Sequence, residues 1–318
     1  MEIPVITKSE HKTIAEAIKD FLFHCKYEKG LSEKTIAAYR IDLSQLEYYF
    51  IEKQLIKKLG EVSKEMIKGY LQQISSYKPK TMKRKIASMK AFFSFQEFED
   101  ETFINPMRKV KIRLKEPSVL PDVMCETEIK MILEYFYKGR SHSNLPESYA
   151  FKTQTRNIAI IELLFATGIR VAELCGLHRS DVDLSQGIIK VNGKGSKERI
   201  IHICSKEVLS ILKEYERLVR PETFFFVNRL GHGTSTQSVR LLIKKCVTKL
   251  NLSKHITPHT FRHTFATLLL EEDVDIKYIQ NLLGHSSIVT TQIYTHVNLN
   301  KQKRILIHKH PRNKLNLR

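Results

Sequence analysis

The chain has 318 residues, of which 42% are hydrophobic, and its formal net charge is +19. This length predicts two domains, and the apolar content is sufficient for packed cores, which argues against a disordered chain. Lysine and arginine outnumber aspartate and glutamate both before and after residue 120. We therefore expect both halves to contact a polyanion, with nucleic acid the first candidate and an acidic membrane surface the second.

Membrane and disulfide-rich classes are not favoured. The longest apolar run, 158–169, is interrupted by Glu162 and is too short to span a bilayer. No signal peptide or lipidation motif is visible. The five cysteines are scattered without C-x-x-C spacing, which argues against a zinc site or a disulfide framework and fits a reduced cytoplasm.

Four helices are predicted in the first third of the chain, over 13–29, 33–53, 63–74 and 80–98. Short connections between them predict a four-helix domain. The fourth helix has a cationic stripe opposite its apolar side, formed by Lys80, Lys83, Arg84 and Lys90. Such a stripe is either a solvated face or a surface that grips phosphates.

Residues 103–122 are predicted to be a linker between a domain at 1–102 and another at 123–318. The segment contains three prolines, which disfavour a continuous helix, and a basic run that includes Lys111. Positive charge on an extended linker would suit contact with a nucleic-acid backbone.

The second domain is predicted to be α-rich around a small three-stranded antiparallel sheet, so that the whole chain is mainly α. The polar stretch 138–155 is interpreted as a surface insertion of unreadable role. The predicted strands are 182–184, 188–191 and 199–203. The predicted helices are 126–137, 156–166, 171–177, 206–220 and 237–250, and the last bears Arg240 and Lys244.

The segment 257–297 concentrates the chemistry of the chain. Pro258 can open a helix, which places His259 and Arg262 three residues apart on one face. A second helix begins at Asp275 and ends at Gly284, a fitting left-handed stop. The next residue, His285, then occupies a turn, and a third helix capped by Ser286 or Ser287 carries Tyr294 on a polar face.

A phenol is a weak nucleophile unless the charge of its reaction partner is neutralised. Two arginines that clamp the non-bridging oxygens of a phosphodiester would supply this neutralisation. Arg262 is one candidate, and Arg170, in the motif ATGIRVAEL, is the second. Taken alone, Arg170 could equally cap a helix or pair with Glu173, which we interpret as a residue that orients its neighbours.

The segments ATGIRVAEL and PHTFRHTFAT, followed by LLGHSS and TTQIYTHV, resemble the tyrosine recombinase (phage integrase) family, and most of all its bacterial Xer-type branch. The resemblance extends over roughly the whole chain, and five functional groups in the family's order make it highly specific. It implies an N-terminal core-binding (SAM-like) DNA-binding domain, a clamp around the duplex, and a C-terminal catalytic domain.

The resemblance also implies roles for single residues. Tyr294 would attack the scissile phosphate while Arg170 and Arg262 bind its oxygens. His259 would act as general base, and His285 would hydrogen-bond the phosphate. The hairpin motif NGKGSKER places Lys194 as general acid toward the leaving 5′-oxygen. Lys197, three residues later, is the alternative residue for that role.

The implied activity is site-specific recombination of double-stranded DNA through a covalent 3′-phosphotyrosine and a Holliday junction. No metal ion or ATP is expected, since the arginines supply the charge and the covalent link keeps the bond energy. The expected partner is a DNA site bound by a homotetramer, or by a heterotetramer with a second recombinase. The C-terminal tail would fit docking into a neighbouring protomer, which its sequence does not establish.

Three other functions fit parts of the sequence. A type IB topoisomerase uses the same chemistry but only relaxes supercoils. A DNA-binding protein that has kept the fold without catalysis would also be cationic. A basic transcription regulator is a third possibility, against which the long spacing between the motifs and the complete catalytic set argue. The biological role, either chromosome dimer resolution or integration and excision of a mobile element, is not encoded in these motifs.

Overall fold

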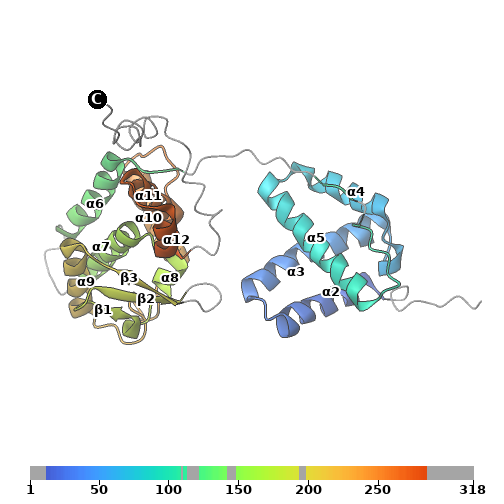
Figure 1. The fold of residues 1–318 in the computed structure, drawn as a ribbon, viewed down its shortest axis with the longest axis horizontal. Helices are drawn as coiled ribbons and strands as arrows, with labels where there is room; N and C mark the ends of the chain where they lie inside the picture. The colour runs from blue at the N-terminus through green and yellow to red at the C-terminus, as the bar shows by residue number, and fades with distance from the viewer. Residues whose placement is uncertain (1–11, 109, 113–121, 142–147, 193–197, 285–318) are drawn as a thin grey trace, which may run out of the picture. The chain divides into compact units, whose positions relative to one another are not determined.

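The computed structural model describes residues 12–108, 110–112, 122–141, 148–192 and 198–284. By its internal contacts the chain divides into two compact units, Met1–Ser118 and Val119–Arg318 (Figure 1). The predicted mainly α architecture with one small antiparallel sheet is confirmed.

The described part of the first unit contains four α-helices, three of which begin at a hydroxyl cap. Thr13, Ser32 and Ser63 each accept a hydrogen bond from a backbone N–H of the following turn, and Pro79 opens the fourth helix. The helices are α2 (Ile14–Phe23), α3 (Glu33–Tyr48), α4 (Lys64–Gln73) and α5 (Pro79–Glu99).

Two of the predicted helices do not stay α-helical to their ends. Instead α2 and α3 continue into π-turns, η1 (His24–Glu28) and η2 (Tyr49–Lys53). Two 3₁₀ turns, η3 (Leu59–Glu61) and η4 (Ile74–Ser76), flank α4. Apolar periodicity predicts that a helix exists but does not distinguish these hydrogen-bond patterns.

Aromatic side chains pack against one another within the largely aliphatic core of the first unit. Phe21 of α2 meets Phe92 of α5 edge-on, with ring centroids 5.8 Å apart. Phe103 and Met107, at the start of the predicted linker, are also buried in this core. The chain therefore contributes packing residues to the first unit beyond the end of α5.

A buried ionic cluster joins α3 to α5. Asp42 is 2% exposed and pairs with Lys85, which is 3% exposed, at 3.1 Å. The same carboxylate also accepts hydrogen bonds from Arg84 at 2.5 Å and from Ser88 at 2.8 Å. These partners compensate the cost of removing the aspartate from water.

The second unit contains a sheet of three antiparallel strands in the order β1-β2-β3. Ile189 of β2 pairs with Val182 of β1 and with Ile201 of β3, and all three are buried in the core. The strands are β1 (Val182–Asp183), β2 (Ile188–Asn192) and β3 (Glu198–His202), and the short helix before them is η5 (Arg179–Asp181).

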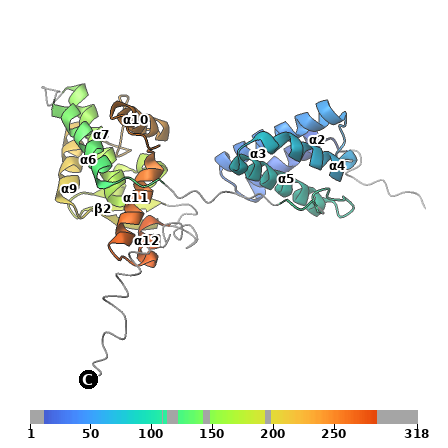
Figure 2. The same cartoon turned by 90° about the horizontal axis from the view of Figure 1, so that it is seen from above.

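Helix α7 is the centre of the second unit, and α6, α9 and α11 all pack against it (Figure 1). Its apolar run from Ile158 to Leu164 fills the core. Helices α11 and α12 lie next to each other in both views (Figure 2). The α-helices among the described residues of this unit are α6 (Glu126–Ser141), α7 (Tyr149–Thr167), α8 (Val171–Cys175), α9 (Lys206–Val219), α10 (Thr236–Lys249), α11 (Pro258–Glu271) and α12 (Ile276–Leu283).

The interpretation of 138–155 as a surface insertion is wrong for most of its length. Helix α6 continues to Ser141, and α7 begins at Tyr149, about two turns before the predicted start. Ser148 caps α7 by accepting a hydrogen bond from Phe151 N at 3.1 Å. Thr155 is fully buried, so this polar stretch is the amphipathic first part of a core helix. Within the described ranges, no helix has the length and apolarity needed to cross a membrane.

Candidate functional site

A left-handed glycine sets the geometry of the Arg170 turn. Gly168 ends α7 with φ +59°. A Cβ atom at this position would lie 2.7 Å from Phe265 Cδ1 of α11 and 3.0 Å from Leu283 Cδ2 of α12. The backbone that leads into Arg170 therefore packs directly against both helices, and only glycine fits there.

Arg262 of α11 is held by backbone carbonyls in the interior of the domain. It is 4% exposed. Its Nη1 donates to Gly168 O at 2.8 Å and its Nη2 to Leu283 O at 2.7 Å. Because a guanidinium does not lose its proton in proteins, these carbonyls hold a permanent positive charge at the junction of α7, α11 and α12.

Arg170 reaches the same junction from the start of α8. Its Nη2 donates to Gly284 O at 2.8 Å, and its side chain is 32% exposed. Leu283 and Gly284 are consecutive, with Cα atoms about 3.8 Å apart, so the acceptors of the two arginines are neighbouring carbonyls at the end of α12. The structure thus brings together two guanidiniums that the sequence predicts to share one phosphate.

Glu173 is the anion that balances this junction. Its carboxylate accepts four hydrogen bonds: from Arg170 N at 3.0 Å, from Arg170 Nη1 at 2.6 Å, and from Arg199 Nη1 and Nη2 at 3.0 and 2.7 Å. The side chain is 7% exposed. Burial raises the pKa of Glu173, but hydrogen bonds from Arg199 and then Arg170 outweigh it, so the pKa lies below its usual value.

Arg199 is the residue of this cluster that sequence reasoning missed. It lies on β3, next to Glu198, inside a motif that drew attention only for its lysines. The available signal was a third arginine close to the hairpin motif, but nothing in the sequence indicates that β3 passes beside α8. Its pairing with Glu173 becomes visible only in three dimensions.

The two histidines of α11 differ in their surroundings. His259 is exposed on the first turn, whose cap Thr257 accepts a hydrogen bond from Thr260 N. His263, one turn later, is partly buried. Burial lowers the pKa of His263, and the neighbouring His259 and Arg262 lower it further, which favours the neutral imidazole.

Three of the predicted catalytic residues, Lys194, His285 and Tyr294, lie outside the described residues, as does the alternative Lys197. In sequence, Lys194 stands between β2 and β3, and His285 directly follows Gly284. Gly284 ends α12 with φ +65°, as its predicted left-handed stop requires.

The predicted DNA-contact residues lie on exposed surfaces, with one qualification. Lys80, Lys83 and Lys90 are exposed along one side of α5, whereas Arg84 is 44% exposed and donates to buried Asp42. Part of the charge of Arg84 is therefore neutralised inside its own domain. Lys111 of the predicted linker and Arg240 and Lys244 of α10 are exposed too.

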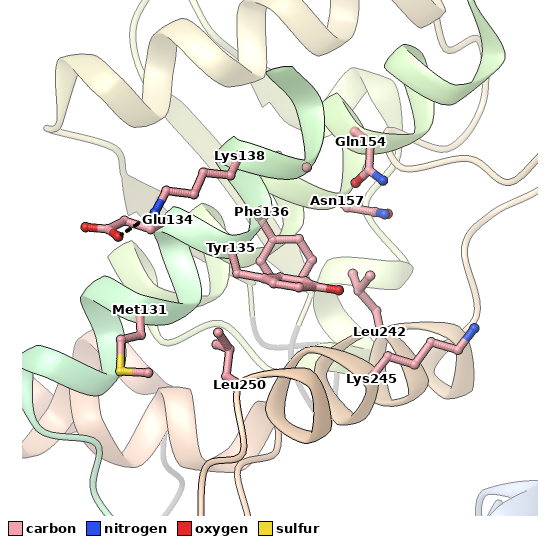
Figure 3. A pocket seen from close by; sticks show the side chains of 11 residues that line it. Met131, Glu134, Tyr135, Phe136, Lys138, Gln154, Asn157, Leu242, Lys245 and Leu250 are labelled. Atoms are coloured by element: carbon pink, nitrogen blue, oxygen red, sulfur yellow. Dashed lines mark hydrogen bonds and ion pairs between the residues drawn. The ribbon is translucent and has the colours of Figure 1, made fainter. Parts of the chain in front are cut away.

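A separate pocket opens between α6 and α10 (Figure 3). Its volume is about 700 Å³, and its lining includes Tyr135 of α6, Gln154 of α7, and Leu242 and Lys245 of α10. Of the predicted catalytic and DNA-contact residues that the structure describes, none lines it. Across the described part of the chain, no group of three or more His, Cys, Asp or Glu side chains is arranged to hold a metal ion.

Comparison with known proteins agrees with this geometry. The Phage integrase family matches residues 126–301, and the family's N-terminal SAM-like domain matches residues 18–99. A tyrosine recombinase of Agathobacter rectalis is 47% identical over 300 residues, which cover 93% of this chain and 96% of that protein. Tyrosine recombinase XerC of Thermodesulfovibrio yellowstonii is 37% identical over 93% of this chain and 97% of its own length.

A solved structure extends the likeness to three dimensions. The XerH site-specific recombinase bound to its difH substrate, a pre-cleavage complex, is 25% identical, with a TM-score of 0.69 over 90% of this chain and 83% of that one. The arginine junction, both domain matches and the extent of the identity lead to one conclusion: this chain belongs to the phage integrase family and is a tyrosine-type site-specific recombinase.

Proposed function

We propose that this recombinase binds double-stranded DNA and exchanges strands through a covalent 3′-phosphotyrosine at Tyr294. A bond forms between the Tyr294 oxygen and the scissile phosphorus as the bond from phosphorus to the 5′-oxygen breaks. His259 accepts the phenolic proton, and Lys194 gives a proton to the leaving 5′-oxygen, so the products are a phosphotyrosine and a free 5′-hydroxyl. A 5′-hydroxyl from the partner duplex then reverses the step and produces a Holliday junction.

The observation that carries the proposal is the meeting of Arg170 and Arg262 at neighbouring carbonyls of α12. When a nucleophile attacks a phosphodiester in line, negative charge builds up on the non-bridging oxygens. Two fixed guanidiniums stabilise that charge without reorganisation. Each guanidinium has five N–H donors in a planar fork, so binding to a phosphate is compatible with the carbonyl hydrogen bonds described above. In this scheme His285 adds a hydrogen bond to the same phosphate.

The proposed DNA surfaces supply affinity without sequence information. Exposed lysines on α5, Lys111 of the linker and the cations of α10 would contact phosphates, which positions the duplex. We propose domain limits of 1–102 and 123–318 around a basic linker whose first residues, Phe103 and Met107, pack into the core of the first unit. We also propose a tetramer assembled on two DNA sites, either of identical chains or with a second recombinase. The biological role would be chromosome dimer resolution or integration and excision of a mobile element.

A nicked suicide substrate tests the chemistry. Such a DNA loses a short 5′-hydroxyl strand after cleavage, so the covalent adduct accumulates and is counted on a denaturing gel. We expect an adduct with the wild-type chain and none with Tyr294→Phe, because phenylalanine has no nucleophilic oxygen. Tyr278→Phe, at an exposed tyrosine of α12, is the matched control and should behave as wild type.

Two outcomes would overturn this assignment. An adduct that persists in Tyr294→Phe would move the nucleophile elsewhere, and a wild-type chain that binds its site without ever forming an adduct would make it a non-catalytic binder. Recombinant product from two sites separates strand exchange from relaxation, since a topoisomerase would reseal each duplex on itself.

A further inference from the structure

The guanidinium of Arg199 is held in three places. Nη1 and Nη2 both donate to the Glu173 carboxylate, at 3.0 and 2.7 Å, and Nε donates to Leu282 O at 3.3 Å. The side chain is 12% exposed. A two-pronged contact of this kind fixes orientation as well as distance, and a lysine cannot reproduce it.

Glu173 passes this constraint on to Arg170. One oxygen, Oε1, accepts from Arg199 Nη1 at 3.0 Å and from Arg170 Nη1 at 2.6 Å. The terminal torsion of a glutamate is broad, so the carboxylate plane is set by its partners more than by its own rotamer preference. Without Arg199, the Glu173 carboxylate that orients the Arg170 guanidinium loses two of the four hydrogen bonds that it accepts.

Arg199 also packs against the end of α12. A Cβ atom on Gly284 would lie 3.0 Å from Arg199 Nη1, 3.1 Å from its Cδ and 3.2 Å from its Cζ. The side chain therefore contacts the residue whose carbonyl receives Arg170, and it bonds the carbonyl of Leu282 in the same turn. Arg199 thus links β3, α8 and the end of α12.

We propose that Arg199 is a positioning residue for the cleavage step: through Glu173 and the end of α12 it holds Arg170 where the scissile phosphate is neutralised. This inference rests on the proposed function, since it assigns Arg170 to that phosphate. Arg199 itself does not touch the DNA in this role. In the sequence, β3 begins four residues after Lys194. The side chain of Arg199 therefore connects the strand that follows the lysine motif to Arg170 through Glu173.

The test is the single-turnover rate of adduct formation on the nicked substrate, at protein concentrations that saturate the DNA. We expect Arg199→Gln to slow adduct formation by up to about 100-fold, the loss that a misplacement of about 1 Å can cause, while DNA affinity stays close to that of wild type. Arg199→Lys keeps the charge without the fork and should be slowed nearly as much. A cleavage rate equal to wild type in both variants would overturn the proposal.

Coupling to Arg170 separates positioning from a general structural role. In a double-mutant cycle with Arg170→Lys, the two rate losses should not multiply, because both changes remove the same placement of one guanidinium. Fully multiplicative losses would contradict the proposal. Arg140→Gln is the control. Arg140 forms a 2.5 Å ion pair with Glu214, and the two side chains of this pair are 24% and 29% exposed. It should lower thermal stability without changing the cleavage rate.

The proposed function and this inference fail in different ways. A wild-type chain that forms no adduct rejects the tyrosine chemistry. If the wild-type chain forms the adduct and the Arg199 variants cleave equally fast, only the role of Arg199 is rejected. Should Arg199→Gln fail to fold, Arg199→Lys retains the charge beside Glu173 and takes its place in the same rate and cycle measurements.

Discussion

At the scale of single residues, Glu173 connects acid stability to the arginine junction. Its folded pKa is lowered, so the unfolded chain binds its proton more readily. The stabilisation is complete above the unfolded value of about 4.3 and is lost as the pH falls through the lower folded value. At neutral pH the carboxylate is therefore ionised and the cluster with Arg170 and Arg199 is intact.

This sign gives a prediction for Glu173→Gln. Breaking a buried ion pair costs about 3–5 kcal/mol, and we expect a loss of that order in urea unfolding at pH 7. Wild type should then lose more stability than the variant between pH 5 and pH 3, because the variant has no carboxylate to protonate there. Parallel stability curves over that interval would show that Glu173 does not titrate with folding.

Gly168 gives a second prediction at this scale. Gly168→Ala introduces a side chain at φ +59° and places its Cβ 2.7 Å from Phe265, so the turn before Arg170 must shift. We expect a destabilisation of about 1–3 kcal/mol together with slower adduct formation. Gly231→Ala is the control: its φ is +77° and nothing lies within 4 Å of its Cβ, so it has the backbone strain without the collision. Equal losses in stability and cleavage for both would argue that strain alone matters.

The proximity of the two arginines was predictable from sequence because motifs carry both residues, whereas contacts that only folding creates were not. Arg170 and Arg262 follow from short motifs and phosphate chemistry, and the structure brings them together. Arg199 does not, because its role depends on β3 passing beside α8, a contact between segments that are separate in the sequence. Arg84 looks like its neighbours on the cationic stripe, and only the packing of α3 reveals its partner Asp42.

At the scale of elements, α5 combines a buried aromatic side with an exposed cationic side. Changing Lys80, Lys83 and Lys90 together to glutamine should weaken binding to any DNA sequence. The slope of log affinity against log salt should shrink by about 2.7, because each DNA phosphate that a lysine neutralises contributes about 0.9 to that slope. The measurement is a salt titration of binding by fluorescence anisotropy.

A charge-matched variant controls for the change in net charge. Helix α9 of the second unit has three exposed cations, Lys206, Lys213 and Arg217. Changing them to glutamine removes the same number of positive charges as the triple variant of α5. We expect the salt slope to stay near the wild-type value. If both triple variants reduce the slope equally, the lysines of α5 act only through total charge and not by binding phosphates.

Element boundaries also show what sequence patterns miss. The start of α7 was predicted at Arg156 because the residues before it are polar, yet Ser148 caps a helix whose first turns are amphipathic. The ends of α2 and α3 were predicted as α-helix, but they relax into π-turns. Caps such as Ser32 and stops such as Gly284 were predicted correctly, since their chemistry is local.

At the scale of the whole molecule, the positive charge is divided between two compact units. Length predicts two domains and composition favours a polyanionic partner, because both predictions depend on sums over many residues. The mainly α class was predictable for the same reason. The detailed packing of β3, α8 and α12 was not, since it arises from a few contacts between distant segments.

The Asp42 cluster has a consequence for how the first unit presents its lysines. A shift of α5 along α3 by one turn would leave the buried Asp42 carboxylate without a counter-ion, at a cost of several kcal/mol. Apolar ridges alone tolerate such slippage more readily. We expect the cluster to fix the position of α5 along α3. The exposed lysines of α5 would then already have their final spacing before DNA binds.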